Sequence, residues 1–180
     1  MAQKKGECTI MGNAERNSFV KAQITEATIR LLGEKELFEI SISEIINKAE
    51  VSRNSFYRNY TDKTDVILQY LRKLYSEWDT KLHENGEISN NELYASLFGH
   101  IKANSEFYLL LKHRGLSHLF LTVLNEQNGA QSSDDNLWAY IKSYLTYGTF
   151  GWIEEWVKRG MKESEEEMMA LLQSQDKQQQ

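Results

Sequence analysis

The most constraining feature of this 180-residue chain is that it contains no proline. Proline normally fills about one position in twenty, and helix interiors exclude it because its ring removes a backbone donor and clashes with the preceding turn. Hydrophobic residues make up 41% and charged residues 26%, which are ordinary proportions for a protein with a packed core. We therefore expect an all-α fold.

Apolar periodicity predicts a first helix that begins near Phe19. Its inward positions recur every three or four residues, at Val20, Ile24, Ala27 and Leu31. Gly33 can end this helix in a left-handed conformation.

Capping signals predict the starts of the next helices. Ser41 and Glu44 have the spacing of a capping box, and Ser52 can cap a short third helix. Thr61 and Asp62 open a fourth helix, which we expect to join a small head to a larger body.

The rest of the chain predicts five further helices, which gives about nine in all. They are expected over 90–103, 105–113, 116–125, 137–159 and from Ser164 onward, with Gly160 as a stop and Glu167 completing a second capping box. Residues 126–136 are the most loop-like stretch.

These elements predict two domains between short tails. Residues 1–15 form a flexible tail, 16–62 the head, 63–175 the body and 176–180 a second flexible tail. The head is charge-balanced: residues 1–65 hold ten Lys/Arg and ten Asp/Glu, so the net charge of -5 comes from the body. This difference in charge indicates that the head and the body have different functions.

Residues 41–63 have the layout of a helix-turn-helix. Their apolar residues can lock two helices together, and the leftover face of the second helix carries no carboxylate. That face suits the phosphates and base edges of a DNA groove. Its residues are Arg53, Asn54, Ser55, Tyr57, Arg58 and Asn59.

The segment from Val51 to Tyr60, followed by Lys63, is similar to the recognition segment of the TetR family of bacterial transcriptional regulators. The resemblance implies a three-helix DNA-binding head, a helical body for effector binding and dimerisation, and a homodimer on a palindromic operator. It also implies a transcriptional regulator, more often a repressor than an activator.

The resemblance assigns the predicted DNA contacts. It implies that phosphates are contacted by Ser43, Ser52, Tyr57 and Lys63. It also implies that the major groove is faced by Arg53, Asn54, Ser55 and Asn59. Arg58 and Tyr60 complete the predicted DNA-binding set.

Glu50 departs from the family pattern, which commonly has glycine in this turn. If the turn needs a positive φ, a residue with a side chain costs up to about 1 kcal/mol. Its carboxylate would also repel a phosphate. The alternative function is therefore a protein-interaction module, or an activator working through a protein partner, with little direct DNA binding.

The last two helices predict the dimer interface. The predicted interface residues are Ile141, Leu145, Gly148, Trp152, Met168, Leu171 and Leu172, and two such hairpins would form a four-helix bundle. The stretch around Gly148, Gly151, Trp156 and Gly160 also resembles the subgroup that includes the activator of a dihydroxyacetone kinase operon.

Other aromatic residues of the body are either core or the lining of an effector cavity for an apolar or planar molecule. They are Tyr70, Tyr75, Trp78, Tyr94, Phe98, Phe107 and Tyr108.

The sequence predicts no enzyme, metal site or cofactor. Cys8 is the single cysteine, so the chain cannot build a disulfide or a cysteine zinc cage on its own. His113 and His118, five residues apart, point to different helix faces. We find no phosphate loop or nucleophile elbow, and no secretion signal or membrane-spanning run, and so expect a cytoplasmic protein.

Overall fold

The computed structural model describes residues 12–84, 86 and 88–178, with side chains placed as far as Ser174. Cys8 and most of the predicted N-terminal tail lie outside these residues, as does the end of the predicted C-terminal tail. The described residues contain nine α-helices, one short 3-10 helix and no strand, so the all-α prediction is confirmed.

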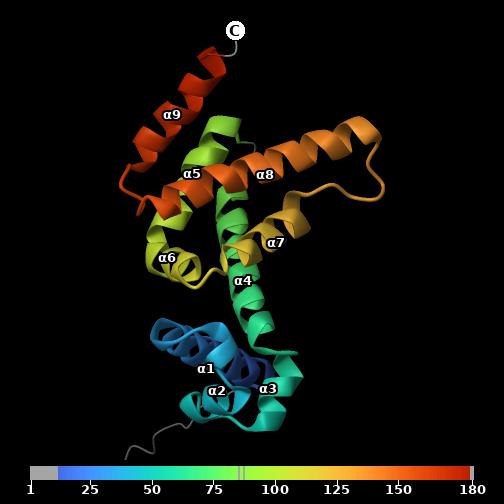
Figure 1. Cartoon of the computed structure of the whole chain (residues 1–180). Helices are drawn as coiled ribbons and strands as arrows, with labels where there is room; N and C mark the ends of the chain where they lie inside the picture. The colour runs from blue at the N-terminus through green and yellow to red at the C-terminus, as the bar shows by residue number, and fades with distance from the viewer. Residues whose placement is uncertain (1–11, 85, 87, 179–180) are drawn as a thin grey trace, which may run out of the picture. The chain divides into compact units, whose positions relative to one another are not determined.

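The helices divide between two compact units, residues 1–66 and 67–180 (Figure 1). The helix α4, Lys63–His83, begins in the first unit and continues into the second. The other elements are α1 (Asn13–Glu34), η1 (Leu37–Glu39), α2 (Ile42–Lys48), α3 (Arg53–Asn59), α5 (Asn90–Ala103), α6 (Ser105–His113), α7 (Ser117–Asn128), α8 (Asn136–Lys158) and α9 (Glu165–Gln178).

The first helix is longer than its apolar pattern predicts. The backbone N–H of Gly12 donates to the Glu15 carboxylate at 2.8 Å, which supports a start at Asn13, ahead of the apolar stripe. At the other end, the prediction that Gly33 ends the helix in a left-handed conformation is wrong. Gly33 stays inside the helix, which ends at Glu34 and is followed by Lys35 in extended backbone conformation with φ of -153°.

The helix-turn-helix is built around buried apolar side chains. Ile24 and Leu32 of α1, Ile45 of α2 and Phe56 of α3 are almost completely buried. The predicted Ser41–Glu44 capping box is present: Glu44 N–H donates to Ser41 Oγ at 3.2 Å, and Ser41 N–H to Glu44 Oε2 at 2.9 Å. The capping box therefore fixes the start of α2, and the apolar side chains fix the packing of the three helices.

In the second unit, α9 packs on α5 and α8 packs on α6 and α7. The Ser164–Glu167 capping box is confirmed, with Ser164 N–H donating to Glu167 Oε2 at 2.7 Å. Helix α7 extends to Asn128, so the loop before α8 is shorter than predicted. No helix in the described part of the chain has the length and apolar character needed to cross a membrane.

Candidate functional site

Helix α3 presents a polar face without carboxylates. Its sequence, RNSFYRN, points Phe56 inward and leaves Arg53, Asn54, Tyr57 and Arg58 exposed. The start of the helix is fixed by Ser52, whose hydroxyl accepts from Ser55 N–H at 3.1 Å. The exposed side chains include guanidinium and amide groups of the kinds that bind phosphates and base edges.

Contacts within the first unit hold part of this face in place. Arg53 Nη2 donates to Ser43 Oγ at 3.1 Å, which joins the beginnings of α2 and α3. Asn59 is turned back, since its Nδ2 donates to the Ser55 carbonyl at 2.8 Å. The Tyr57 ring stands edge-on to Phe56 with 5.4 Å between centroids. On this face Arg53 and Asn59 are therefore held by bonds within the unit, whereas Asn54 and Arg58 are exposed to solvent.

The structure corrects the prediction for Tyr60. Its side chain is only 3% exposed, and its hydroxyl lies 3.2 Å from Thr25 Oγ1, so it cannot touch DNA in this arrangement. Lys21 Nζ lies 5.9 Å from the ring centroid, and burial raises the pKa of the phenol. Tyr60 therefore anchors α3 to α1.

Lys63 has partners inside the first unit. Its ammonium donates to the Phe38 carbonyl at 3.1 Å and to the Ile40 carbonyl at 2.7 Å. A lysine ammonium has three donors, so a phosphate contact from Lys63 stays a prediction.

Glu50 adopts the conformation that favours glycine, with φ of 54°. It follows α2 in a Schellman motif: Val51 N–H donates to the Ile46 carbonyl at 3.1 Å and Glu50 N–H to the Asn47 carbonyl at 3.3 Å. The same motif ends α6 and α8, but with Gly115 and Gly160 at the corresponding position. The side chain of Glu50 therefore carries a conformational cost that the two glycines avoid.

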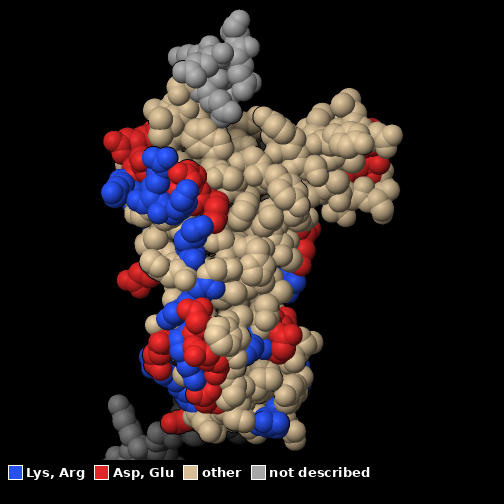
Figure 2. All heavy atoms as spheres, viewed as in Figure 1, with Lys and Arg blue, Asp and Glu red and all other residues tan. Residues whose placement is uncertain are grey.

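The charges of the first unit are mixed in sign. Figure 2 shows Lys/Arg and Asp/Glu side chains side by side on its visible face. Glu44 bonds Lys35, and this bond, together with those to Ser41, lowers the pKa of Glu44 to about 2. Lys48 Nζ lies 2.6 Å from Glu34 Oε1. Helix α3 itself carries no carboxylate, whereas Glu50 precedes it in the turn and Asp62 follows it.

In the second unit, one cavity of about 460 Å³ gathers part of the predicted aromatic set. Tyr75, Trp78 and Tyr94 line it. The structure does not bring the others there: Phe107 and Tyr108 are buried in the core, Tyr70 packs edge-on against Phe107, and Phe98 packs on Trp156.

Sequence reasoning missed the polar lining of this cavity, which includes Asn128, Lys142 and Thr146. These residues come from α7 and α8, whereas the aromatic residues come from α4 and α5. Single polar positions on separate helices give no local signal, so only the packing of the helices reveals them.

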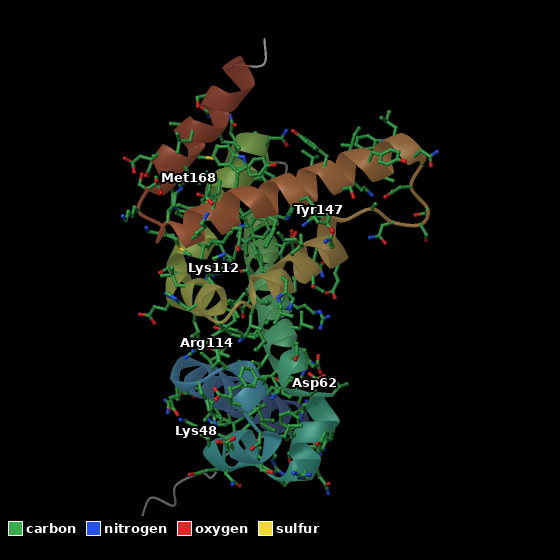
Figure 3. The ribbon with its side chains drawn as sticks, viewed as in Figure 1. Lys48, Asp62, Lys112, Arg114, Tyr147 and Met168 are labelled. Carbon is green, nitrogen blue, oxygen red and sulfur yellow. The ribbon has the colours of Figure 1, made fainter. Side chains whose placement is uncertain are left out.

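The outward face of α8 is apolar and uncovered. Tyr140 is 77% exposed, Tyr144 71% and Leu145 49%, and no atom lies within 4 Å of the position that a β-carbon on Gly148 would take. Figure 3 labels Tyr147 on the same helix, a further exposed aromatic residue that the prediction omitted. Leu137 and Trp138 were likewise omitted and are exposed.

The structure places the predicted interface residues unevenly. Ile141, Trp152 and Leu172 are half-buried and Leu171 is 48% exposed, so all four retain accessible surface. Met168, labelled in Figure 3, is a correction: it is only 4% exposed and packs inside its own chain.

The described residues contain no group of three His, Cys, Asp or Glu side chains that could hold a metal ion. Burial of the His100 imidazole lowers its pKa below the ordinary value.

Comparisons with known proteins agree with this geometry. A family model of bacterial regulatory proteins of the tetR family matches residues 24–70, and a model of the C-terminal region of such transcriptional regulators matches residues 89–175. Together the two models cover the helix-turn-helix and most of the second unit. The resemblance to the dihydroxyacetone kinase activator subgroup is not confirmed by these findings.

Two individual proteins are also similar. The uncharacterized HTH-type transcriptional regulator YxbF of Bacillus subtilis strain 168 is 27% identical over 119 residues, which are 60% of this chain but 30% of YxbF. The crystal structure of Lin0861 from Listeria innocua covers 96% of this chain, and 97% of that chain is matched, with a TM-score of 0.76 at 14% identity, so it supports the fold. On the two family models and the helix-turn-helix, the chain belongs to the TetR family of transcriptional regulators.

Proposed function

We propose that this chain is a homodimeric repressor that binds an inverted-repeat operator through α3 and releases it when a small effector binds the second unit. The observation that carries the proposal is the exposed face of α3, where Arg53, Asn54 and Tyr57 are accessible and no acidic side chain intervenes. Members of the family are more often repressors than activators of transcription. A DNA partner also implies a cytoplasmic location.

The roles of individual residues follow from side-chain chemistry. Arg53 and Asn54, at the beginning of α3, are suited to bidentate bonds with guanine and adenine. Ser43, Ser52, Tyr57 and Lys63 are assigned to phosphates, which fix the register without selecting sequence. Ser55 and Asn59 are assigned to the major groove, where Asn59 would have to release its bond to the Ser55 carbonyl, and Arg58 completes the DNA-binding set.

Dimerisation is assigned to the uncovered face of α8 together with the exposed part of α9. A large apolar face on a small domain is typical of an interaction surface. Glycines at Gly148 and Gly151 leave room for a partner helix, because nothing of the same chain approaches their outer sides. A twofold dimer would pair two α3 helices with two half-sites.

Effector control is assigned to the cavity beside Tyr75, Trp78 and Tyr94. A ligand shifts the protein only insofar as it binds the DNA-incompetent arrangement more tightly. A hundredfold loss of operator affinity needs about 2.7 kcal/mol of differential binding. Because α4 runs from Lys63 to His83 and borders the cavity with Tyr75 and Trp78, we assign the coupling to this helix.

The test is selection of bound duplexes from a random pool. We expect enrichment of an inverted repeat, and a reporter with that duplex across its promoter should be silenced. Recovery of duplexes without any shared sequence would contradict the proposal.

A second candidate function is a protein-interaction module with a weak head. Glu50 in the turn and the equal numbers of acidic and basic residues in the head favour it. Parallel pull-downs with sheared genomic DNA and with lysate separate the two candidates. Retention of a defined protein and no DNA at low salt would support the second.

A further inference from the structure

We propose that the cavity of the second unit takes an uncharged, largely apolar ligand whose hydroxyl or carbonyl group bonds the hydroxyl of Thr146. The inference rests on the proposed function, in which this cavity is the effector site. It goes beyond that function because it names the charge and the hydrogen-bonding group of the ligand.

The cavity is large enough for a two-ring molecule and is mainly apolar. Its volume is about 460 Å³, within the usual range for small-molecule sites. Tyr75 and Trp78 meet edge-to-face, with 5.2 Å between ring centroids, and form one wall. Leu97 and Leu124, both nearly buried, contribute to the lining. Such walls favour a planar apolar body.

Most polar groups of the aromatic wall already have partners in the protein. Trp78 Nε1 donates to Ser96 Oγ at 2.9 Å, and the Tyr75 hydroxyl exchanges bonds of 3.1 and 2.8 Å with the Asn128 amide. These groups do not need a ligand to satisfy them.

The cations of the lining are also paired or solvated. Lys142 Nζ lies 2.8 Å from each carboxylate oxygen of Asp134, and hydrogen bonds from Gln131 and Lys142 lower the pKa of that carboxyl. His83 Nδ1 lies 3.4 Å from the Asp79 carboxylate, and both side chains are about half exposed. An anionic ligand would lose its hydration without finding a free cation, and a cationic ligand would meet only the half-exposed, solvent-screened Asp79 carboxylate, so an uncharged ligand is favoured.

Thr146 supplies the polar contact. Two buried polar residues occur in the described part of the chain, Thr28 and Thr146. The hydroxyl of Thr28 donates to the Ile24 carbonyl at 2.8 Å. Thr146 is only 5% exposed, lines the cavity, and its hydroxyl has no hydrogen bond to any described residue. A hydroxyl can donate and accept, so a carbonyl or hydroxyl of the ligand can satisfy it.

The test uses three probes of one ring size that differ in charge: 2-naphthol, 2-naphthoate and 2-naphthylmethylammonium. Calorimetry on the full chain at pH 7 should show 2-naphthol binding at least about tenfold more tightly than either ion. Thr146→Val should weaken the binding of 2-naphthol by roughly tenfold, and Thr146→Ser should bind it as tightly as wild type does. Thr122→Val is the matched control, since that hydroxyl donates to the His118 carbonyl outside the cavity, and it should change nothing.

Equal binding of the three probes, no binding of any of them, or an unaffected Thr146→Val variant would each overturn the inference. Operator binding by the same preparations distinguishes this failure from that of the proposed function. If the selected duplex is bound but the probes are not, the ligand assignment alone fails. If no duplex is selected, the proposed function fails whatever the probes do.

Discussion

Helices α3 and α8 each leave one face uncovered, and the two faces have opposite chemistry. On α3 the exposed side chains are basic, amide and hydroxyl groups around a single aromatic residue, Tyr57. On α8 the exposed face from Leu137 to Trp152 carries aromatic and aliphatic side chains and two glycines. Only the first face can exchange water for phosphates and base edges. The second suits another protein surface, and the family membership makes a second copy the first choice.

The largest expected effect is on the α8 face. Gly148→Glu places a carboxylate where nothing of the same chain lies within 4 Å, so the single chain should tolerate it. Glutamate should even favour the helix by up to about 1 kcal/mol relative to glycine. In a dimer the charge would be buried, and we expect the dissociation constant to rise at least about hundredfold. Sedimentation equilibrium measures this change.

Gly33→Glu is the matched control, because Gly33 is also helical and exposed, and no atom lies within 4 Å of the position that its β-carbon would take. It should leave the dimer intact. A Gly148→Glu protein that dimerises like the control would contradict the assignment of the dimer interface to the uncovered face of α8.

The next effect concerns base reading by α3. Arg53→Ala or Asn54→Ala should weaken operator binding by about 1–3 kcal/mol and relax the preference at one base pair. Tyr57→Phe and Lys63→Ala should weaken binding to all sequences alike. Gel shifts on the selected operator and on a scrambled duplex measure both quantities. Equal binding of both duplexes by wild type and all four variants would contradict a recognition role for α3.

A smaller effect is expected at the turn between α2 and α3. Glu50→Gly should raise the free energy of unfolding by up to about 1 kcal/mol, because glycine takes the positive φ without strain. It should also tighten DNA binding, since it removes a carboxylate.

Glu50→Gln separates these two contributions: it removes the charge and keeps the strain, so DNA binding should improve without a gain in stability. Gly115→Ala provides the reverse case and should destabilise the chain, as its φ is 66°. Urea titrations at pH 7 measure the stabilities. A Glu50→Gly protein no more stable than wild type would show that the turn is unstrained.

The smallest effect is the acid dependence of the first unit. Hydrogen bonds from Lys35 and Ser41 lower the pKa of Glu44 from 4.5 to about 2. A depressed carboxyl pKa stabilises the fold above the unfolded value and loses that stability as pH falls through 4.5 toward 2. Glu44→Gln should therefore lower stability at pH 7 and flatten its loss between pH 5 and pH 2.

Glu92→Gln is the comparison in the second unit, because Glu92 sits in a capping box with Ser89 and its pKa is also lowered. The pKa of Glu92 is lowered by hydrogen bonds from Ser89, with no lysine partner among the described residues, so the flattening should be weaker than for Glu44→Gln. Urea titrations across the pH range compare the two, and identical pH profiles would argue against a contribution from Lys35.

Much of the fold was predictable because its signals are local. The capping boxes at Ser41 and Ser164 and the stop at Gly160 depend on residues a few positions apart, and all three are present. The positive φ of Glu50 was predictable for the same reason.

Other parts depend on contacts between distant residues. Tyr60 was assigned to DNA because it lies in the recognition segment, yet its hydroxyl meets Thr25 of α1. Composition does not distinguish the core residues Phe107 and Tyr108 from residues that line the cavity. A single threonine in a helix gives no sign that Thr146 lines the cavity. Their roles follow from how α4, α5, α7 and α8 pack, which periodicity alone does not specify.

Duplex selection carried out in parallel with wild type and Gly148→Glu tests the central claim most directly. The account predicts an inverted repeat for wild type, and for the variant only a single half-site or a much weaker enrichment of the same repeat. An unsymmetrical sequence selected by wild type, or the same strong inverted repeat selected by both proteins, would contradict it.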